Sequence, residues 1–150
     1  MSLDNTRRLL LKTILAGVAL AASPVWALTR NKAAFEAKQP DAALKALFGD
    51  KPISESDEVG LKVPDIAENG AVVPVTVATT LAGAKSISIV VAANPNPLSA
   101  SFTLLPGANA EISTRIKIGE SSDVIAAVET DAGIFTASKN VKVTIGGCGG

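Results

Sequence analysis

The segment Ile112-Ser113-Thr114-Arg115-Ile116-Lys117-Ile118 places isoleucine or threonine at every second position, with serine, arginine or lysine between them. Successive side chains of a β-strand point to opposite faces of its sheet, so this alternation predicts a strand with one buried face. Residues 86–91 and 141–145 follow the same period of two. We therefore predict that all three segments are strands of one core.

Turn-forming residues separate these segments from one another and from their neighbours. They are Asn69-Gly70, Asn94-Pro95-Asn96-Pro97, Pro106-Gly107, Gly119 and Asp131-Ala132-Gly133. About seven short strands at this spacing predict a mainly β fold, an immunoglobulin-like antiparallel β-sandwich over residues 54–145. Pro74 lacks a donor for one ladder bond, which predicts that residues 72–77 form an edge strand or carry a bulge. The last predicted strand, residues 140–145, runs directly into the terminal glycines.

Residues 28–53 are predicted to form a short helical segment before the sandwich. Alanine, a strong helix former, recurs between residues 31 and 48. Pro40-Asp41 is expected to split this stretch in two, with Asp41 capping the second helix and Gly49 ending it. Leu44, Leu47 and Phe48 share one helix face, which we expect to pack on its own domain rather than on a partner protein.

Residues 1–27 have the pattern of a secretory signal peptide. Arg7 and Arg8 precede an apolar run that is too short for a membrane span, and small residues follow as far as Ala27. The paired arginines, with Thr6 and Lys12 around them, favour a twin-arginine signal over an ordinary secretory one. We therefore predict export, cleavage after Ala27 and no stable membrane anchor.

The composition excludes several classes of function. The 150 residues have a formal net charge of zero, which gives no reason to expect nucleic-acid binding. The chain has no histidine and one cysteine, so Ser-His-Asp catalysis, Cys-His catalysis and an ordinary zinc site within the chain are excluded. We expect neither a bound metal nor a cofactor.

Cys148 stands at the centre of the terminal sequence Gly146-Gly147-Cys148-Gly149-Gly150. Glycine leaves the backbone free, so these residues are predicted to act as an arm that carries the thiol up to about 10 Å from Ile145. A thiolate is the nucleophile in sulfur–sulfur bond formation, but no cationic side chain flanks Cys148 to stabilise it. We therefore expect another protein to activate this cysteine, as for a carrier without an active site of its own.

The terminal glycine–cysteine motif, together with the preceding Val141-Lys142-Val143-Thr144-Ile145, resembles the SoxY family of bacterial thiosulfate oxidation. Weaker similarity covers residues 68–75, 94–97 and 113–117, and the signal region resembles that of the family too. The resemblance implies a periplasmic protein in which Cys148 is the covalent attachment point for thiosulfate-derived sulfur. It also implies a complex with a second β-sandwich protein, SoxZ, and no enzymatic activity in the carrier itself.

The family resemblance further implies that separate periplasmic enzymes act on the carried sulfur. They comprise a c-type cytochrome, a hydrolase that releases sulfate and, in some organisms, a sulfane dehydrogenase. Two other functions remain open from the residues alone. Cys148 could join an exported structural protein to a partner through a disulfide, or Gly149-Gly150 could be activated as a C-terminal thiocarboxylate. The export signal and the sandwich pattern weigh against the thiocarboxylate, because its activation uses cytoplasmic ATP.

Replacing Arg7 and Arg8 together with lysine is expected to leave the precursor in the cytoplasm, because the twin-arginine route recognises the paired arginines. Fractionation and N-terminal sequencing measure this, with the wild-type chain as control, whose periplasmic form should begin near Leu28. Normal export of the lysine variant would mean that the signal is of another type.

Overall fold

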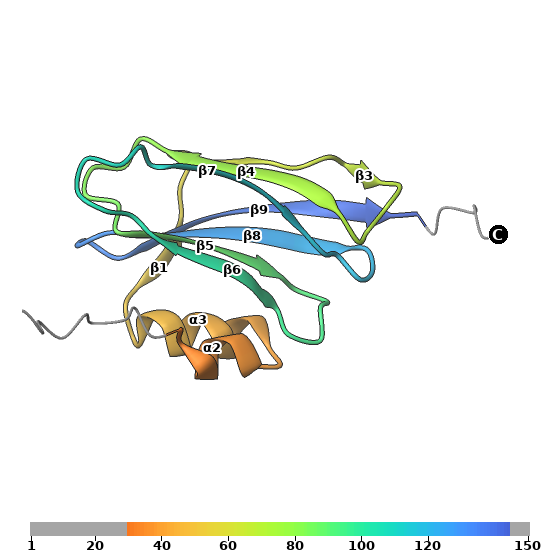
Figure 1. The fold of residues 1–150 in the computed structure, drawn as a ribbon. Helices are drawn as coiled ribbons and strands as arrows, with labels where there is room; N and C mark the ends of the chain where they lie inside the picture. The colour runs from red at the N-terminus through yellow and green to blue at the C-terminus, as the bar shows by residue number, and fades with distance from the viewer. Residues whose placement is uncertain (1–29, 145–150) are drawn as a thin grey trace, which may run out of the picture. The chain divides into compact units, whose positions relative to one another are not determined.

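A computed structural model describes residues 30–144 of the chain. Two helices and two β-sheets make up this part (Figure 1). The helices are α2 (Lys32–Glu36) and α3 (Pro40–Phe48). The larger sheet has the order β1 (Ile53–Glu55), β9 (Ile134–Val143), β8 (Ser122–Glu129), β5 (Ser86–Val91), β6 (Leu98–Thr103), and β3 (Ile66–Ala67) pairs with β9 as well. The smaller sheet has the order β2 (Val59–Lys62), β4 (Val73–Thr79), β7 (Glu111–Ile116).

The predicted β-sandwich is confirmed. The strands of four or more residues number seven among the described residues, and they pair with one another in antiparallel fashion throughout. Two very short strands, β1 and β3, were not predicted, and both pair with β9 in parallel. A strand of two or three residues is too short to show a period of two, so the sequence pattern contains no sign of either.

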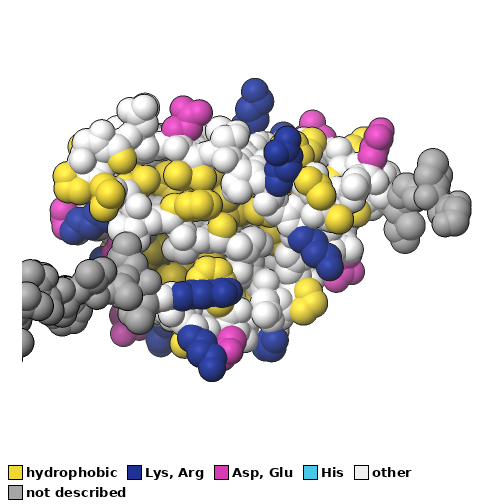
Figure 2. All heavy atoms as spheres, in the orientation of Figure 1, with side chains coloured by type: hydrophobic (Ala, Val, Ile, Leu, Met, Phe, Trp, Pro, Cys, Tyr) yellow, Lys and Arg dark blue, Asp and Glu magenta, His cyan; other side chains and the backbone are white. Residues whose placement is uncertain are grey.

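The main core lies between the two sheets. In β7 and just beyond it, Ile116 and Ile118 are buried while Arg115 and Lys117 are exposed, as the alternation predicts. Ile87, Ile89 and other fully buried residues from β4, β5 and β8 fill the same core. On the side of the edge strands β6 and β7 this core is less covered, and Figure 2 shows hydrophobic side chains in the opening between the sheets. Phe102, Leu104 and Ile112 are only partly buried.

A second core lies on the outer face of the larger sheet, where the helices pack (Figure 1). Its members come from both helices and from β5, β6, β8 and β9: Ala34, Ala43, Leu44, Phe48, Val90, Leu98, Ala127 and Ile134. The prediction of one buried face is therefore wrong for β5, in which all six residues are buried. Ser88 is fully buried there, and its hydroxyl is paired with that of Ser101 at 2.9 Å.

The helical segment follows the prediction in outline, and its apolar face packs on its own domain as expected. Pro40 is the first residue of α3, a position where proline loses no helical hydrogen bond. The predicted capping role of Asp41 is wrong, because the N-cap is Gln39 and makes no side-chain bond. Asp41 instead lies in the first turn, where its charge favours the helix dipole. Gly49 ends α3 with a φ of 67°, as expected of a glycine at this position.

The prediction for Pro74 is wrong, because β4 is the central strand of the smaller sheet. The proline is tolerated there because β2 is short. The pairing of β2 with β4 ends at Lys62 and Thr76, so β4 has a neighbour on one side only at Pro74, where it lies opposite Arg115 of β7.

The last strand is longer than the predicted 140–145. It begins at Ile134, directly after the predicted turn at Gly133, whose φ of 151° suits glycine. It is described as far as Val143, so Ile145 lies outside the described residues. Neither helix of residues 30–144 is long and apolar enough to cross a membrane.

Phe48→Ala is expected to lower the free energy of unfolding by about 3–5 kcal/mol, because it removes a buried aromatic ring and leaves a cavity beneath α3. Urea unfolding measures the change. The control is Leu105→Ala, a side chain that is 69% exposed, which should stay within about 0.5 kcal/mol of wild type. Equal stability of the two variants would mean that the helices do not stabilise the sheet.

Candidate functional site at the C-terminal end of β9

The residues that the sequence singled out lie outside the described part of the chain. These are Cys148 with Gly146, Gly147, Gly149 and Gly150, and the signal residues Arg7, Arg8 and Ala27. The structure describes the chain up to Thr144, four positions before Cys148. The site is therefore built from the residues that hold the end of β9.

The end of β9 is bonded to the chain on both of its edges. On the β8 side, the Val143 N–H donates to Ser121 Oγ at 2.8 Å. On the other side, the Lys142 N–H donates to the Asp65 carbonyl at 2.9 Å and the Thr144 N–H to the Ala67 carbonyl at 3.1 Å. The expectation that a sheet strand leads into the C-terminal segment is confirmed as far as Thr144.

The predicted turn at Asn69-Gly70 packs against the same strand end. Asn69 accepts a side-chain hydrogen bond from the Ala71 N–H at 3.0 Å, which shapes the turn. The Gly70 carbonyl accepts from the Ile118 N–H at 2.7 Å. A Cβ on Gly70 would lie 2.3 Å from the Ile118 carbonyl oxygen and 2.9 Å from Val143 Cγ1. Only glycine therefore allows this turn to touch β9.

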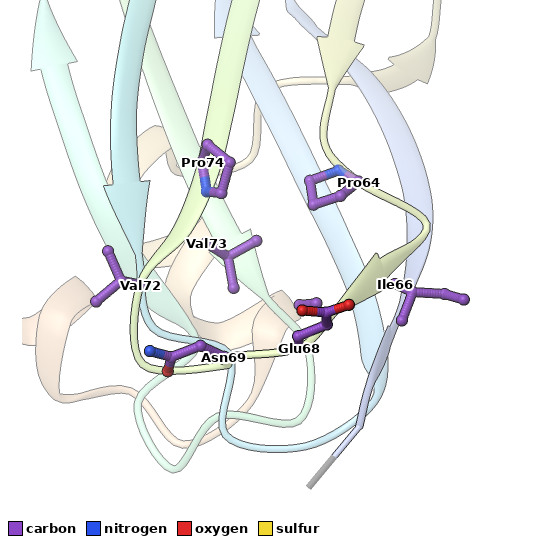
Figure 3. Close-up of a pocket in the computed structure, with 8 residues that line it drawn as sticks. Pro64, Ile66, Glu68, Asn69, Val72, Val73 and Pro74 are labelled. Carbon is purple, nitrogen blue, oxygen red and sulfur yellow. The ribbon is translucent and has the colours of Figure 1, made fainter. Parts of the chain in front are cut away.

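A shallow groove of about 360 Å³ lies beside this strand end, between β3 and the start of β4 (Figure 3). Eight residues line it: Pro64, Ile66, Ala67, Glu68, Asn69, Val72, Val73 and Pro74. Six of them are apolar. Ala67 and Val73 are buried, whereas Ile66 is 56% and Val72 is 52% exposed. The groove thus presents large apolar side chains to solvent next to the point where β9 ends.

Lys139 closes the open stretch of the β9 edge between β1 and β3. Its ammonium lies 3.0 Å from the Asp65 carboxylate and donates to the Val63 carbonyl at 2.9 Å. The pairing of β1 with β9 stops at Thr136, and that of β3 starts at Lys142. A charged side chain on an unpaired strand edge discourages association through that edge, so we assign Lys139 a structural role.

A cluster of charged side chains lies at the opposite end of the sheet, where β8 ends and β9 begins. Burial alone would raise the pKa of Glu129, but hydrogen bonds from Lys51 at 2.5 Å and Ser86 at 3.0 Å, with the nearby lysine charges, hold it below its usual value. Lys85 donates a hydrogen bond to the Asp131 carboxylate, and this bond raises the pKa of Lys85 and lowers that of Asp131. A carboxyl group whose pKa is lowered by folding stabilises the folded state at pH values above its pKa in the unfolded chain. This contribution is lost as the pH falls through the lowered pKa of the folded state. The cluster therefore connects the loops that contain Lys51 and Asp131 to the sheet through hydrogen bonds and ion pairs.

The described part of the chain has little of the chemistry of an active site. Residues 30–144 contain neither cysteine nor histidine. No group of three or more Asp, Glu, His or Cys side chains among them could hold a metal ion. This region instead holds Lys142, Val143 and Thr144 through hydrogen bonds that their backbone N–H groups donate, and these residues precede the segment that contains Cys148.

Comparison with known families identifies the chain. The family model described as "Sulfur oxidation protein SoxY" matches residues 44–148. This chain belongs to the SoxY family. The matched range covers the sandwich and extends through Cys148, so the family relationship includes the cysteine that the sequence pattern singled out.

Solved structures agree with this assignment. The sulfur carrier protein SoxY from Chlorobium limicola f thiosulfatophilum is 45% identical, with a TM-score of 0.65, over 70% of this chain and 96% of that one. A superoxide reductase (neelaredoxin) from Ignicoccus hospitalis is 19% identical, with a TM-score of 0.53, over 71% and 94% of the two chains. At that identity the likeness concerns the fold alone. A search of curated protein sequences found no match.

Sequence reasoning found the thiol of this SoxY protein but missed the residues that hold its base. Ser121 bonds Val143, and Asp65 and Ala67 bond the other edge of β9. No local pattern marks them, because the contacts join residues 22 to 77 positions apart. The one local signal near this strand end was Asn69-Gly70. The sequence predicted a turn there but gave no indication that its glycine lies against Ile118 and Val143.

Gly70→Ala is expected to lower the free energy of unfolding by about 1–3 kcal/mol, because the new methyl group collides with the backbone of Ile118 and forces the turn away from Val143. Urea unfolding measures this. Gly60→Ala is the matched control, since a Cβ there would lie 3.4 Å from the Ala78 carbonyl oxygen. A Gly70→Ala variant as stable as the Gly60→Ala variant would show that the turn does not need to touch β9.

Proposed function

We propose that this SoxY protein carries thiosulfate-derived sulfur covalently on Cys148 and presents it to partner enzymes. The observation that supports this most directly is the family match, which extends through Cys148. The described structure adds a strand end held on both edges four residues before the cysteine. Gly146, Gly147, Gly149 and Gly150 would form the arm that moves the thiol between partners.

The proposed loading step is an oxidation. The Cys148 thiolate and the outer sulfur of thiosulfate form one S–S bond, and two electrons leave. A c-type cytochrome of the periplasmic sulfur-oxidation system is the proposed acceptor of these electrons. A hydrolase would then add water and release the outer group as sulfate, and a sulfane dehydrogenase would act on the remaining sulfur in organisms that have one.

The carrier is proposed to have no catalytic activity of its own. No lysine, arginine or histidine stands among residues 143–150, so the activation of the Cys148 thiol is assigned to the enzyme pockets that receive it. A SoxZ-like β-sandwich subunit is the proposed stable partner. The periplasm is the proposed compartment, reached through the signal that contains Arg7 and Arg8 and is cleaved after Ala27.

Intact mass of protein isolated from its source without reductant tests the carrier against its alternatives. An added mass that corresponds to several sulfur and oxygen atoms on Cys148 supports the carrier. A doubled mass supports an intermolecular disulfide. Replacement of one oxygen of the Gly150 carboxylate by sulfur, with Cys148 unmodified, supports a thiocarboxylate.

Cys148→Ser is expected to abolish sulfur loading and to leave the melting temperature within about 1–2 °C of wild type, because surface changes cost little stability. Intact mass after incubation with thiosulfate and the native loading enzymes measures the first effect, and thermal denaturation the second. Retained loading would assign the sulfur to another atom. A large fall in melting temperature would mean that the cysteine packs against the fold.

Gly147→Val and Gly149→Val are expected to slow enzyme-catalysed loading far more than alkylation by iodoacetamide. A β-branched side chain restricts the backbone and adds bulk beside the sulfur, which a narrow enzyme channel would exclude and a small reagent would not. The ratio of the two rates is the measurement, with wild type as reference. Ratios equal to that of wild type would favour the disulfide function, where the arm is only a spacer.

A further inference from the structure

We infer that the apolar groove beside the end of β9 is the surface on which the enzymes that load and unload Cys148 rest. We define this arm-base groove by the eight residues that line it (Figure 3). The inference rests on the proposed function, and it specifies which face of the carrier its partners recognise.

The first argument is the length of chain between the groove and the thiol. The Thr144 N–H is bonded to the carbonyl of Ala67, which lines the groove, so the last described residue lies at the wall of the groove. Cys148 is four residues further on and can reach at most about 13–14 Å from Thr144, even when fully extended. An enzyme whose reactive group lies inside a channel must therefore bring its channel mouth close to Thr144. A protein surface at that distance lies over the residues that surround the end of β9.

The second argument is the exposure of the groove. Four large hydrophobic side chains are exposed among the described residues, and Ile66 and Val72 are two of them. Figure 3 shows them on the two sides of the groove, Ile66 on β3 and Val72 just before β4. The other two are Ile53 and Leu105. Two exposed apolar side chains beside the last described residues of β9 give a partner a surface to bury.

The third argument is that the groove is rigid before any partner arrives. Pro64 and Pro74 have fixed φ angles, and the turn at Asn69 and Gly70 is held by hydrogen bonds and by its contact with β9. A preformed surface loses little conformational entropy on binding, which favours recognition by several different enzymes. The same turn touches Val143, so the groove and the base of the arm form one unit.

The charge at the groove indicates the chemistry of the partner surface. Glu68 is exposed at the centre of the groove (Figure 3), and no ion pair or hydrogen bond of its side chain occurs within residues 30–144. A carboxylate that has no partner among residues 30–144 and is flanked by apolar side chains can bind a partner surface in which a lysine or arginine lies beside an apolar side chain. We therefore assign the groove to enzymes that carry such a surface at the mouth of the channel that admits Cys148.

The test compares Ile66→Ser and Val72→Ser with Leu105→Ser, a control that removes an exposed leucine near Asp131, at the opposite end of the sheet. Each full-length variant is loaded by the thiosulfate-conjugating cytochrome complex of the same organism, and intact mass gives the rate. The two groove variants are expected to show a fall in kcat/KM of about tenfold or more, mainly through KM, because exposed interface residues act through binding. Leu105→Ser should load at the wild-type rate. Melting temperatures confirm that every variant is folded.

A second pair of measurements separates docking from chemistry. Alkylation of Cys148 by iodoacetamide should be the same in wild type and in all three variants, since a small reagent needs no docking surface. Glu68→Lys should weaken loading and Glu68→Gln should weaken it less, because only lysine repels a basic partner surface.

Wild-type loading rates in both Ile66→Ser and Val72→Ser would overturn the docking inference and leave the carrier function intact. Loss of the stable complex with the β-sandwich subunit in these variants, seen by size-exclusion chromatography, would also overturn it and assign the groove to that subunit. Failure of wild type itself to load sulfur on Cys148 would overturn the proposed function, and the docking inference with it.

Discussion

The backbone hydrogen bonds along β9 are the interaction on which the rest of the described structure depends. This ten-residue strand pairs with β8 at eight positions, with β1 at its start and with β3 at its end. It thereby connects the loop after the helices, the loop before β4 and the centre of the larger sheet. The segment that contains Cys148 follows the last described residues of β9 in the sequence. The strand that organises the sheet therefore also fixes the position of Thr144, four residues before the thiol.

Two cores stabilise the larger sheet, one on each face. The smaller sheet covers one face and the two helices cover the other, which explains why β5 is buried throughout. The residues of both cores come from the described part of the chain, whereas the proposed chemistry belongs to Cys148, which follows it in the sequence.

The end of β9 shows how fold and function meet in this SoxY protein. Ser121 holds one edge, β3 holds the other, and Gly70 lets a turn approach Val143 closely. The same arrangement forms the arm-base groove, because β3 and the turn at Asn69 line it. The proposed carrier function needs a fixed base for the segment that bears Cys148, and these contacts supply one as far as Thr144.

The sequence by itself determined the two-sheet sandwich, the buried faces of β7 and of the end of β9, the split of the helices at Pro40, the position of the single thiol and the family. These are local properties, since a period of two, a proline or a glycine–cysteine motif is visible within a few residues. Only the tertiary structure decided that β1 and β3 exist, that β5 is buried on both faces, that β4 is central despite Pro74, and that Ile66 and Val72 flank one groove. The physical reason is that a strand such as β3 forms because it meets Lys142 and Val143, about 76 positions later in the chain, and neither partner carries a local pattern that names the other.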